Sequence, residues 1–344
     1  MKYFITGGCG FLGSNLAAKA LADGHDLCIL DNLSREGAAQ NLKWLQGQGK
    51  FTFIQGDVRT SGELEKVVKD FAPNVIFHLA GQVAMTTSLD NPRLDFEINV
   101  LGGFNLLEAV RKFAPETTVI YSSTNKVYGG LEKVPYREEA KRYVSDQHPN
   151  GFDEFTSLDF QSPYGCSKGT IDQYMLDYAR IYGLKTVVFR HSSIFGGRQF
   201  STRDQAWVGW FIKEALRVSN GSPDPIEICG DGKQVRDLLF IDDLVSCYFT
   251  AAKNIEKVRG EAFNLGGGQG NSLSLLELLD FLGKELGVAI KIKNNPWRQS
   301  DQKIFIADIS KIKSRIDWTP KVDRFSGLKE AVSWVREEQR LSKT

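Results

Sequence analysis

The sequence predicts an α/β protein built on a doubly wound parallel sheet, with a smaller α/β lobe formed by its carboxyl-terminal part. Short runs of β-branched and aromatic residues alternate with helix-like segments through residues 1–191. Runs that are apolar along their whole length are typical of strands buried on both faces between helices. A cluster of glycines directly follows the first of these runs and opens the first helix-like segment. Together these observations favour parallel strands whose ligand-binding loops lie at their carboxyl ends.

The elements of the sheet are predicted in chain order from apolar runs that stop at turn residues. Right-handed crossovers connect such strands through the helices between them. The residues from Thr60 to Glu63 have the pattern of a capping box that opens one of these helices. We expect strands at 2–6, 26–30, 51–55, 74–78, 117–121 and 184–190, and helices near 11–23, 61–71, 94–113 and 164–182.

The alternation loosens after residue 130. Residues 130–160 are polar and rich in turn formers, which predicts an insertion before the next helix. Beyond residue 192 we expect strands at 226–229, 261–265 and 288–293 in the smaller lobe, and a helix opened by a capping box from Ser274 to Glu277. The glycine run 266–268 lacks the lysine of a phosphate loop and is interpreted as a turn. The predicted domains are therefore 1–191, with some later segments returning to it, and 192–344.

Composition indicates a soluble globular protein. The 344 residues carry 43 basic and 42 acidic side chains, and 42% of them are hydrophobic. This balance predicts no nucleic-acid partner, and no run approaches the ~20 apolar residues of a membrane span. Five scattered cysteines and four separated histidines form no ligand pattern, so no metal site or disulfide framework is expected. With no secretory signal pattern at the amino end, we expect a cytoplasmic protein.

The strongest local pattern is the glycine cluster between the first strand and the first helix. Gly7, Gly10 and Gly13 have the spacing G-x-x-G-x-x-G, with Phe11 and Leu12 inside it. Glycines allow a tight turn and close backbone approach to a pyrophosphate, which then meets the N–H groups of the helix. The fold class is therefore the Rossmann type, and the ligand expected at this turn is a dinucleotide.

A carboxylate at the end of the second strand indicates which dinucleotide binds. Asp31 lies 18 residues after Gly13, where it can accept hydrogen bonds from the adenosine ribose hydroxyls. Its charge would repel a 2′-phosphate, so NAD is favoured over NADP, although the nearby Arg35 argues weakly for a phosphate. Asp57 and Val58 are expected to flank the adenine. Leu79, Ala80, Gly81 and Gln82 are expected to pass beneath the dinucleotide.

A catalytic group is predicted from the spacing Tyr164-x-x-x-Lys168 at a helix start. Ser162 and Pro163 are a cap and a first helical residue, so the tyrosine and the lysine share one helix face. A phenol with a pKa of about 10 needs nearby positive charge to act as a base near neutral pH. Thr124 ends the fifth strand, at the sheet edge beside this helix, and its hydroxyl can meet the phenol.

With these motifs in order, the sequence resembles the extended short-chain dehydrogenase/reductase family over essentially its whole length. The likeness is carried by residues 81–88, 122–129, 162–168, 189–200 and 232–237. The resemblance assigns Thr124, Tyr164 and Lys168 as catalytic residues and Asn99 as a helix residue that supports the site. It also implies a tightly held NAD, a homo-oligomer (dimer or tetramer), and a nucleotide-sugar in the smaller lobe. On the same basis we expect Asn32, Ser34, Ser122 and His191, together with Tyr164 and Lys168, among the cofactor contacts.

Two departures from the wider family indicate the reaction. The 4,6-dehydratases of this family have an Asp-Glu pair after the strand-end threonine, where this chain has Asn125 and Lys126. Many 4-epimerases have a phosphate-binding asparagine after the sixth strand, where this chain has Ser193. Within the family the chain is most similar to the 2-epimerases of CDP-hexoses. The resemblance therefore implies inversion of C2 of a CDP-hexose through a transient keto sugar.

The smaller lobe must hold a diphosphate and a pyrimidine. Arg198, Arg236 and Arg298 are candidates because guanidinium groups bind phosphate oxygens in pairs. Asp301, three residues after Arg298, matches an R-x-x-D pattern of the family and is expected on ribose hydroxyls. A 4-epimerase or reductase, or an NAD-binding sensor without catalysis, are the alternatives. The expected substrate-binding residues are Gln82, Thr124, Asn125, Ser193, Arg198, Gln199, Arg236, Arg298 and Asp301.

Overall fold

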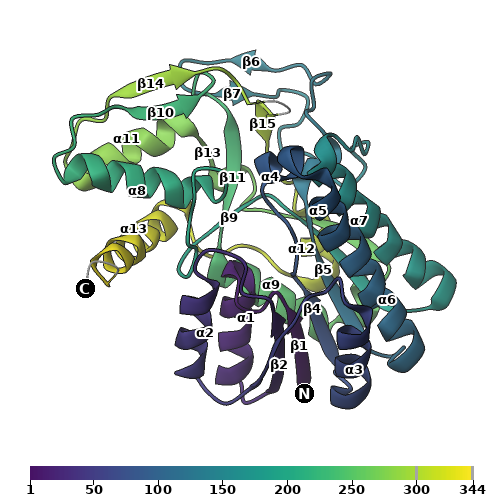
Figure 1. Ribbon diagram of the computed structural model, residues 1–344. Helices are drawn as coiled ribbons and strands as arrows, with labels where there is room; N and C mark the ends of the chain where they lie inside the picture. The colour runs from purple at the N-terminus through teal and green to yellow at the C-terminus, as the bar shows by residue number, and fades with distance from the viewer. Residues whose placement is uncertain (299–300, 342–344) are drawn as a thin grey trace.

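The computed structural model describes residues 1–298 and 301–341, and its centre is a seven-stranded parallel sheet (Figure 1). The strands lie in the order β12–β8–β5–β4–β1–β2–β3. The order reverses between β1 and β4, which is the switch point where doubly wound sheets bind ligands. The strands are β1 (Lys2–Thr6), β2 (Asp26–Asp31), β3 (Thr52–Gln55), β4 (Val75–His78), β5 (Thr118–Thr124), β8 (Lys185–His191) and β12 (Glu261–Leu265).

Helices cover both faces of this sheet, which is why its strands are apolar throughout. One apolar cluster packs α3 (Ser61–Phe71), α6 (Gly102–Phe113) and α7 (Ser162–Tyr182) on one face. A second and larger cluster on the other face includes side chains of α1 (Phe11–Ala22), α2 (Ala38–Gln46), α9 (Ile241–Lys253), α10 (Ile255–Val258) and α12 (Ser310–Ile316). Among the described residues, no helix is long and apolar enough to cross a membrane.

The smaller lobe lies beyond the carboxyl ends of the central strands (Figure 1). Its strands β10 (Ile226–Cys229) and β14 (Ile292–Asn295) form a parallel pair, whereas β11 (Val235–Phe240) pairs with β9 (Ser193–Phe195), β13 (Ser272–Ser274) and β15 (Ile304–Phe305). Its helices are α8 (Trp207–Ser219), α11 (Leu275–Leu286) and α13 (Arg324–Leu341), and η3 (Gln269–Asn271) is a single 3₁₀ turn.

Shorter elements connect the sheet to the lobe. The loop after β4 contains α4 (Met85–Asp90), α5 (Pro92–Phe96) and a π-helical turn, η1 (Glu97–Leu101), that leads into α6. The 3₁₀ turn η2 (Asn125–Tyr128) follows β5. The polar insertion contains only two short strands, β6 (Arg137–Glu138) and β7 (Tyr143–Val144). It is attached to the lobe by a hydrogen bond from the Tyr143 amide to the Lys233 carbonyl (3.1 Å).

Most strands expected before residue 191 are confirmed, but three details of the prediction are wrong. Residues 261–265 belong to the central sheet and not to the smaller lobe, because β12 pairs in parallel with β8. The Thr60 side chain makes no cap, because the Glu63 amide donates to the Thr60 carbonyl (3.2 Å), and the Glu63 carboxylate accepts from the Asp57 amide (2.8 Å). The third strand of the lobe begins at Ile292, later than the 288–293 run suggested. The Ser274 capping box is confirmed, with the Glu277 amide donating to Ser274 Oγ (3.1 Å).

Candidate active site

The turn between β1 and α1 is tight enough to require glycine. Gly7 has a φ of +71°, and a Cβ at Gly13 would lie 2.2 Å from the Gly7 carbonyl oxygen. A Cβ at Gly7 would also meet the amide nitrogen of Ala80, after β4, at 2.7 Å. The turn therefore brings backbone against backbone at the switch point and leaves the amino end of α1 as an anion site. This is a cradle of the kind that a dinucleotide pyrophosphate fits.

The Asp31 carboxylate is fixed beside this turn. Its Oδ2 accepts from the Cys9 amide (2.9 Å) and its Oδ1 from the Leu33 amide (2.8 Å). Burial raises the pKa of Asp31, and these two hydrogen bonds oppose the rise. Since each oxygen retains a second lone pair, the carboxylate can also accept from ribose hydroxyls. Asp31 and the glycine turn together fit NAD.

The residues expected around the adenine also gather here. Asn32 Nδ2 donates to Asp57 Oδ2 (2.9 Å), and its Oδ1 accepts from the Ser34 amide (3.0 Å). The hydrogen bonds from Arg59 lower the pKa of Asp57 to about 2. Val58 is buried beside them. Arg35 lies close enough to Tyr164 for its charge to lower the pKa of that tyrosine.

Thr124 and Tyr164 meet as the sequence predicts. Thr124 ends β5, and its side chain hydrogen-bonds the Tyr164 side chain in the first turn of α7. Ser162 has a φ of +63°, and its Oγ accepts from the Gly165 amide (3.2 Å), which fixes that first turn. Burial raises the pKa of Tyr164 to about 12, against the Thr124 hydrogen bond and the Arg35 charge. A further positive charge is needed for the phenol to work as a base near neutral pH.

Lys168 lies one turn along α7 and is almost completely buried. Its Nζ donates to the Ser122 carbonyl and lies 4.4 Å from the centre of the Tyr121 ring. Burial lowers its pKa to about 7, although the carboxylates of Asp95 and Asp172 favour the charged form. An ammonium here is therefore held by oxygens, an aromatic face and two buried carboxylates.

His191 lies at the end of β8, opposite Thr124 in the register of the sheet, and its side chain reaches Ser122. Its Nδ1 is 3.2 Å from Ser122 Oγ, and its Nε2 is 3.2 Å from the Tyr248 hydroxyl. Burial lowers its pKa to about 3, so the ring is neutral. A neutral imidazole between two hydroxyl groups fixes the Ser122 and Tyr248 side chains without adding a charge beside them.

The π-helical turn η1 positions Asn99, which the sequence resemblance selects as a supporting residue. Asn99 Oδ1 accepts from the Gln82 amide (2.9 Å), and its Nδ2 donates to Ser167 Oγ (2.9 Å). It thereby joins the loop after β4 to α7. Isolated π turns are common at functional sites, and no sequence signal identifies this one. Sequence reasoning also missed Asp95, a buried carboxylate that accepts from Gln82 Nε2 (2.9 Å).

A pocket of about 280 Å³ extends from Tyr164 into the smaller lobe. Asn125 and Ser193 line its sheet end, and Arg236, Arg298 and Asp301 line it farther out, as expected of substrate-binding residues. Sequence reasoning selected neither Arg203 nor Glu227 from its outer wall, because they lie in segments without a motif. Trp207 and Trp210 both line the pocket. No group of residues in the described parts of the chain has the ligands to hold a metal ion.

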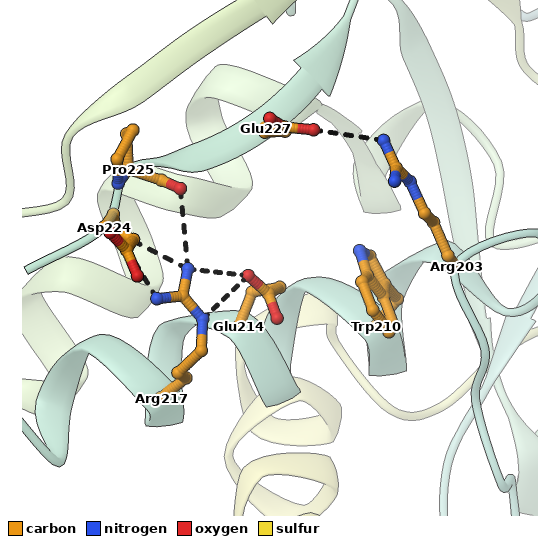
Figure 2. A pocket seen from close by; sticks show the side chains of 7 residues that line it. All are labelled: Arg203, Trp210, Glu214, Arg217, Asp224, Pro225 and Glu227. Atoms are coloured by element: carbon orange, nitrogen blue, oxygen red, sulfur yellow. Dashed lines mark hydrogen bonds and ion pairs between the residues drawn. The ribbon is translucent and has the colours of Figure 1, made fainter. Parts of the chain in front are cut away.

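A second hollow of about 280 Å³ adjoins the outer end of this pocket (Figure 2). Arg203, Trp210 and Glu227 line both hollows. Arg203 NH2 donates to Glu227 Oε2 (3.1 Å) above the Trp210 side chain, and Arg217 is held by Glu214 deeper inside (Figure 2). The pocket therefore continues outward into a polar chamber with an aromatic side chain on its wall.

Three expected substrate contacts lie outside the substrate pocket. The Arg198 guanidinium packs over the Trp44 ring (4.8 Å) and donates to Asn41 Oδ1 (2.9 Å), on the side of α2. Gln199 Nε2 donates to the Ile194 carbonyl (3.1 Å). The Gln82 side-chain amide donates to Ala84 and Asp95, so local hydrogen bonds use the groups predicted to meet the substrate. None of the three is among the residues that line the described pocket.

Comparison with known proteins relates this geometry to a family. The model of the NAD dependent epimerase/dehydratase family matches residues 3–266. The CDP-paratose 2-epimerase of Salmonella typhi is 57% identical over 335 residues, which cover 97% of this chain and 99% of that protein.

Solved structures agree in fold. The UDP-glucose 4-epimerase of Thermotoga maritima, solved with UDP-glucose, superposes with a TM-score of 0.84 at 29% identity, covering 98% of this chain and 100% of that one. The Thermus thermophilus UDP-glucose 4-epimerase, solved with NAD, gives a TM-score of 0.79 at 28% identity, covering 98% and 99%. The chain matches these proteins over nearly its whole length, and it has the glycine turn, the Asp31 carboxylate and the Thr–Tyr–Lys group described above. This chain belongs to the NAD dependent epimerase/dehydratase family.

Proposed function

We propose that this protein is an NAD-dependent nucleotide-sugar epimerase that inverts C2 of a CDP-hexose, as in the conversion of CDP-paratose to CDP-tyvelose. The observation that carries the proposal is the 57% identity, over nearly the whole of both chains, with a CDP-paratose 2-epimerase. Two more distant relatives are a putative UDP-glucose 4-epimerase of Methanocaldococcus jannaschii, at 32% identity, and the UDP-glucose 4-epimerase of Mycolicibacterium smegmatis, at 30%. The Thr124–Tyr164–Lys168 group supplies the acid–base chemistry that such a reaction needs.

The chain's own residues supply the proton transfer and the positioning. Tyr164 accepts the proton of the sugar hydroxyl and later returns it, while Thr124 orients both the phenol and that hydroxyl. Lys168, held by Ser122 and Tyr121, supplies positive charge behind them. The glycine turn and Asp31 would hold NAD, which would supply reversible hydride transfer with the sugar carbon. Between the forward and return transfers the keto sugar must turn over while its nucleotide stays anchored.

The residues proposed to hold NAD surround the switch point of the sheet. The glycine turn holds the pyrophosphate, Asp31 the ribose, and Asn99 supports the loop that passes beneath. We assign to this site Gly7, Gly10, Phe11, Leu12, Gly13, Asp31, Asn32, Ser34, Arg35, Asp57, Val58, Leu79, Ala80, Gly81, Gln82, Asn99, Ser122, Tyr164, Lys168 and His191. For the substrate we keep Thr124, Asn125, Ser193, Arg236, Arg298 and Asp301.

Isotope labelling tests which carbon reacts. CDP-paratose deuterated at C2 is incubated with the purified protein, and the product is analysed by NMR. Because the hydrogen removed from C2 is returned to C2, we expect CDP-tyvelose that keeps its label. Tyr164→Phe, which preserves the ring but lacks the hydroxyl, should react about 10²–10⁴-fold more slowly.

Two results would contradict this proposal. Inversion at C4 would make the protein a 4-epimerase. Loss of the C2 label to solvent would mean deprotonation beside a ketone at another carbon. A matched substrate deuterated at C4 is the control, since its label should neither slow the reaction nor be lost.

We further propose a cytoplasmic homodimer formed through α6 and α7, which lie side by side at one edge of the molecule (Figure 1). Their outer surface exposes several large apolar side chains that the monomer leaves in contact with water. A two-fold axis would place these helices against the same helices of a second copy, the commonest arrangement of soluble oligomers. The exposed side chains are Phe104, Tyr174, Ile181 and Tyr182.

A further inference from the structure

Lys126 lies between the two elements that carry the catalytic side chains. It belongs to η2, directly after β5, and its amide donates to Thr124 Oγ1 (3.3 Å). Its carbonyl oxygen packs against the start of α7, since a Cβ at Gly165 would lie 3.3 Å from it. The backbone of Lys126 is therefore fixed two residues after Thr124 and against Gly165, the residue that follows Tyr164.

The side chain of Lys126 extends from there along the pocket wall. Its Nζ is 3.9 Å from Asp301 Oδ1, and Arg236 NH2 is 2.8 Å from the same oxygen. Two cationic groups thus share the Asp301 carboxylate. Asp237, whose charge also acts on Arg236, points away into hydrogen bonds with Ser192 and the Gly268 amide. Burial and the Arg236 charge lower the pKa of Lys126 to about 8, so an anion arriving here would relieve an unfavourable charge.

Inversion at C2 brings the β-phosphate of the substrate close to the base. In a nucleotide-hexose the β-phosphate is bonded to O1, and C2 is bonded to C1. When the C2 hydroxyl meets Tyr164, the β-phosphate must therefore lie beside the catalytic residues. When the C4 hydroxyl meets Tyr164, the whole width of the sugar ring separates the phosphate from them. The position of the phosphate-binding charge therefore distinguishes the two reactions.

We propose that Lys126, together with Arg236, binds the β-phosphate of the substrate and thereby places C2, and not C4, at the Thr124–Tyr164 pair. The inference rests on the proposed function and adds to it a residue that determines which carbon reacts. A phosphate held at this point is also a pivot next to the reacting carbon. The sugar ring can then turn over about its phosphate link while C2 remains within reach of Tyr164.

Comparison of nucleotides with and without a β-phosphate tests the binding role. Dissociation constants of CDP, CMP, UDP and UMP are measured by calorimetry for the wild-type holoenzyme, Lys126→Met and Lys126→Arg. We expect Lys126→Met to raise the dissociation constants of CDP and UDP about 10- to 100-fold, because one charge-assisted hydrogen bond is lost. The dissociation constants of CMP and UMP should rise less than about twofold. Lys126→Arg should recover most of the loss. Lys133→Met, at an exposed lysine of the insertion, should leave all four unchanged.

Each other outcome decides against the inference. An equal loss of affinity for the mono- and diphosphates would place Lys126 on the α-phosphate or the nucleoside. Unchanged affinity for CDP would show that Lys126 does not bind the nucleotide. Turnover of C2-labelled CDP-paratose by Lys126→Met supplies the second measurement, and wild-type turnover in that variant would also overturn the proposal. The binding test does not depend on turnover, and it compares nucleotides of two nucleobases, cytosine and uracil. If the wild-type protein does not epimerise C2 but Lys126→Met still loses affinity for CDP and UDP selectively, the proposed function is refuted and the phosphate site is not.

Discussion

The Lys168 side chain is buried in an environment that disfavours its protonated, charged form. Burial lowers its pKa to about 7 from the ordinary value of 10.5. Between these two values the unfolded chain binds a proton that the folded chain does not bind. The free energy of unfolding therefore gains a contribution that rises with pH across this interval.

This pH dependence is measurable as a difference between two proteins. We expect the stability of the wild type, relative to Lys168→Met, to increase from pH 7 to pH 9.5 by up to about 1.4 kcal/mol per pH unit. Urea unfolding of both proteins without added NAD gives the two curves. Lys126 titrates in both proteins and cancels in the difference. Parallel curves would show that Lys168 keeps an ordinary pKa in the folded protein.

At the scale of single residues, the grouping of Thr124, Tyr164 and Lys168 and part of the pocket wall could be predicted. The outer wall of the pocket could not. Tyr164 and Lys168 are four apart at a helix start, and Thr124 ends a strand, so local spacing and sheet topology suffice to bring them together. Arg203 and Glu227 come from loop and strand positions whose side chains meet only through the tertiary fold. Arg198 was expected on a phosphate from its residue type and position alone, and in the structure its guanidinium packs on the Trp44 ring.

The connection between β1 and α1 is the element on which the cofactor site depends. Its geometry leaves no room for a side chain at Gly13, whose added Cβ would lie 2.2 Å from the Gly7 carbonyl oxygen. The conflict is with backbone atoms, which cannot move aside as a flexible side chain can. A change here must therefore displace the turn, and with it the amide groups that face the pyrophosphate.

Gly13→Ala should lose about 1–3 kcal/mol of stability through overpacking and should retain little NAD after gel filtration. Gly62→Ala is the matched control, because it lies in a helix and its Cβ would meet no atom within 4 Å. That variant should keep NAD and gain about 0.5–1 kcal/mol from the lower entropy of its unfolded chain. Denaturant unfolding and cofactor absorbance check both variants. Normal NAD retention by Gly13→Ala would show that the turn adapts to a side chain.

The elements themselves were predictable where burial leaves an unambiguous pattern. The strands before residue 191 are apolar on both faces, so their runs stand out against the helices. The run 261–265 stands out equally well, yet its pattern says nothing about which sheet receives it, and the pairing with β8 is a contact between distant segments. The helix α2 and the π turn at Asn99 have no comparable periodic signal.

At the scale of the whole molecule, α6 and α7 present the apolar surface proposed to form a dimer. Phe104 and Tyr174 contact one another there, with ring centres 5.7 Å apart, and remain 37% and 41% exposed. Burying this pair against a second copy would remove apolar area from water without disturbing the sheet beneath.

Replacing both side chains, as Phe104→Asp with Tyr174→Asp, should convert a dimer to a folded monomer. Light scattering coupled to gel filtration measures the mass, and circular dichroism checks the fold. Phe155→Asp is the control, because Phe155 is 93% exposed on the insertion and belongs to neither helix. A wild-type monomer, or a double variant that remains dimeric, would exclude this surface.

The position of β12 at the edge of the central sheet determines when that sheet can be completed. Residues 185–191 emerge during synthesis well before residues 261–265, so the nascent chain carries β8 with one row of N–H and C=O groups unpaired. During that interval another chain could add to this edge and begin to aggregate. The long sequence separation between the two strands also raises the contact order, which slows folding. A fragment that ends at residue 191 would keep its edge strand permanently open.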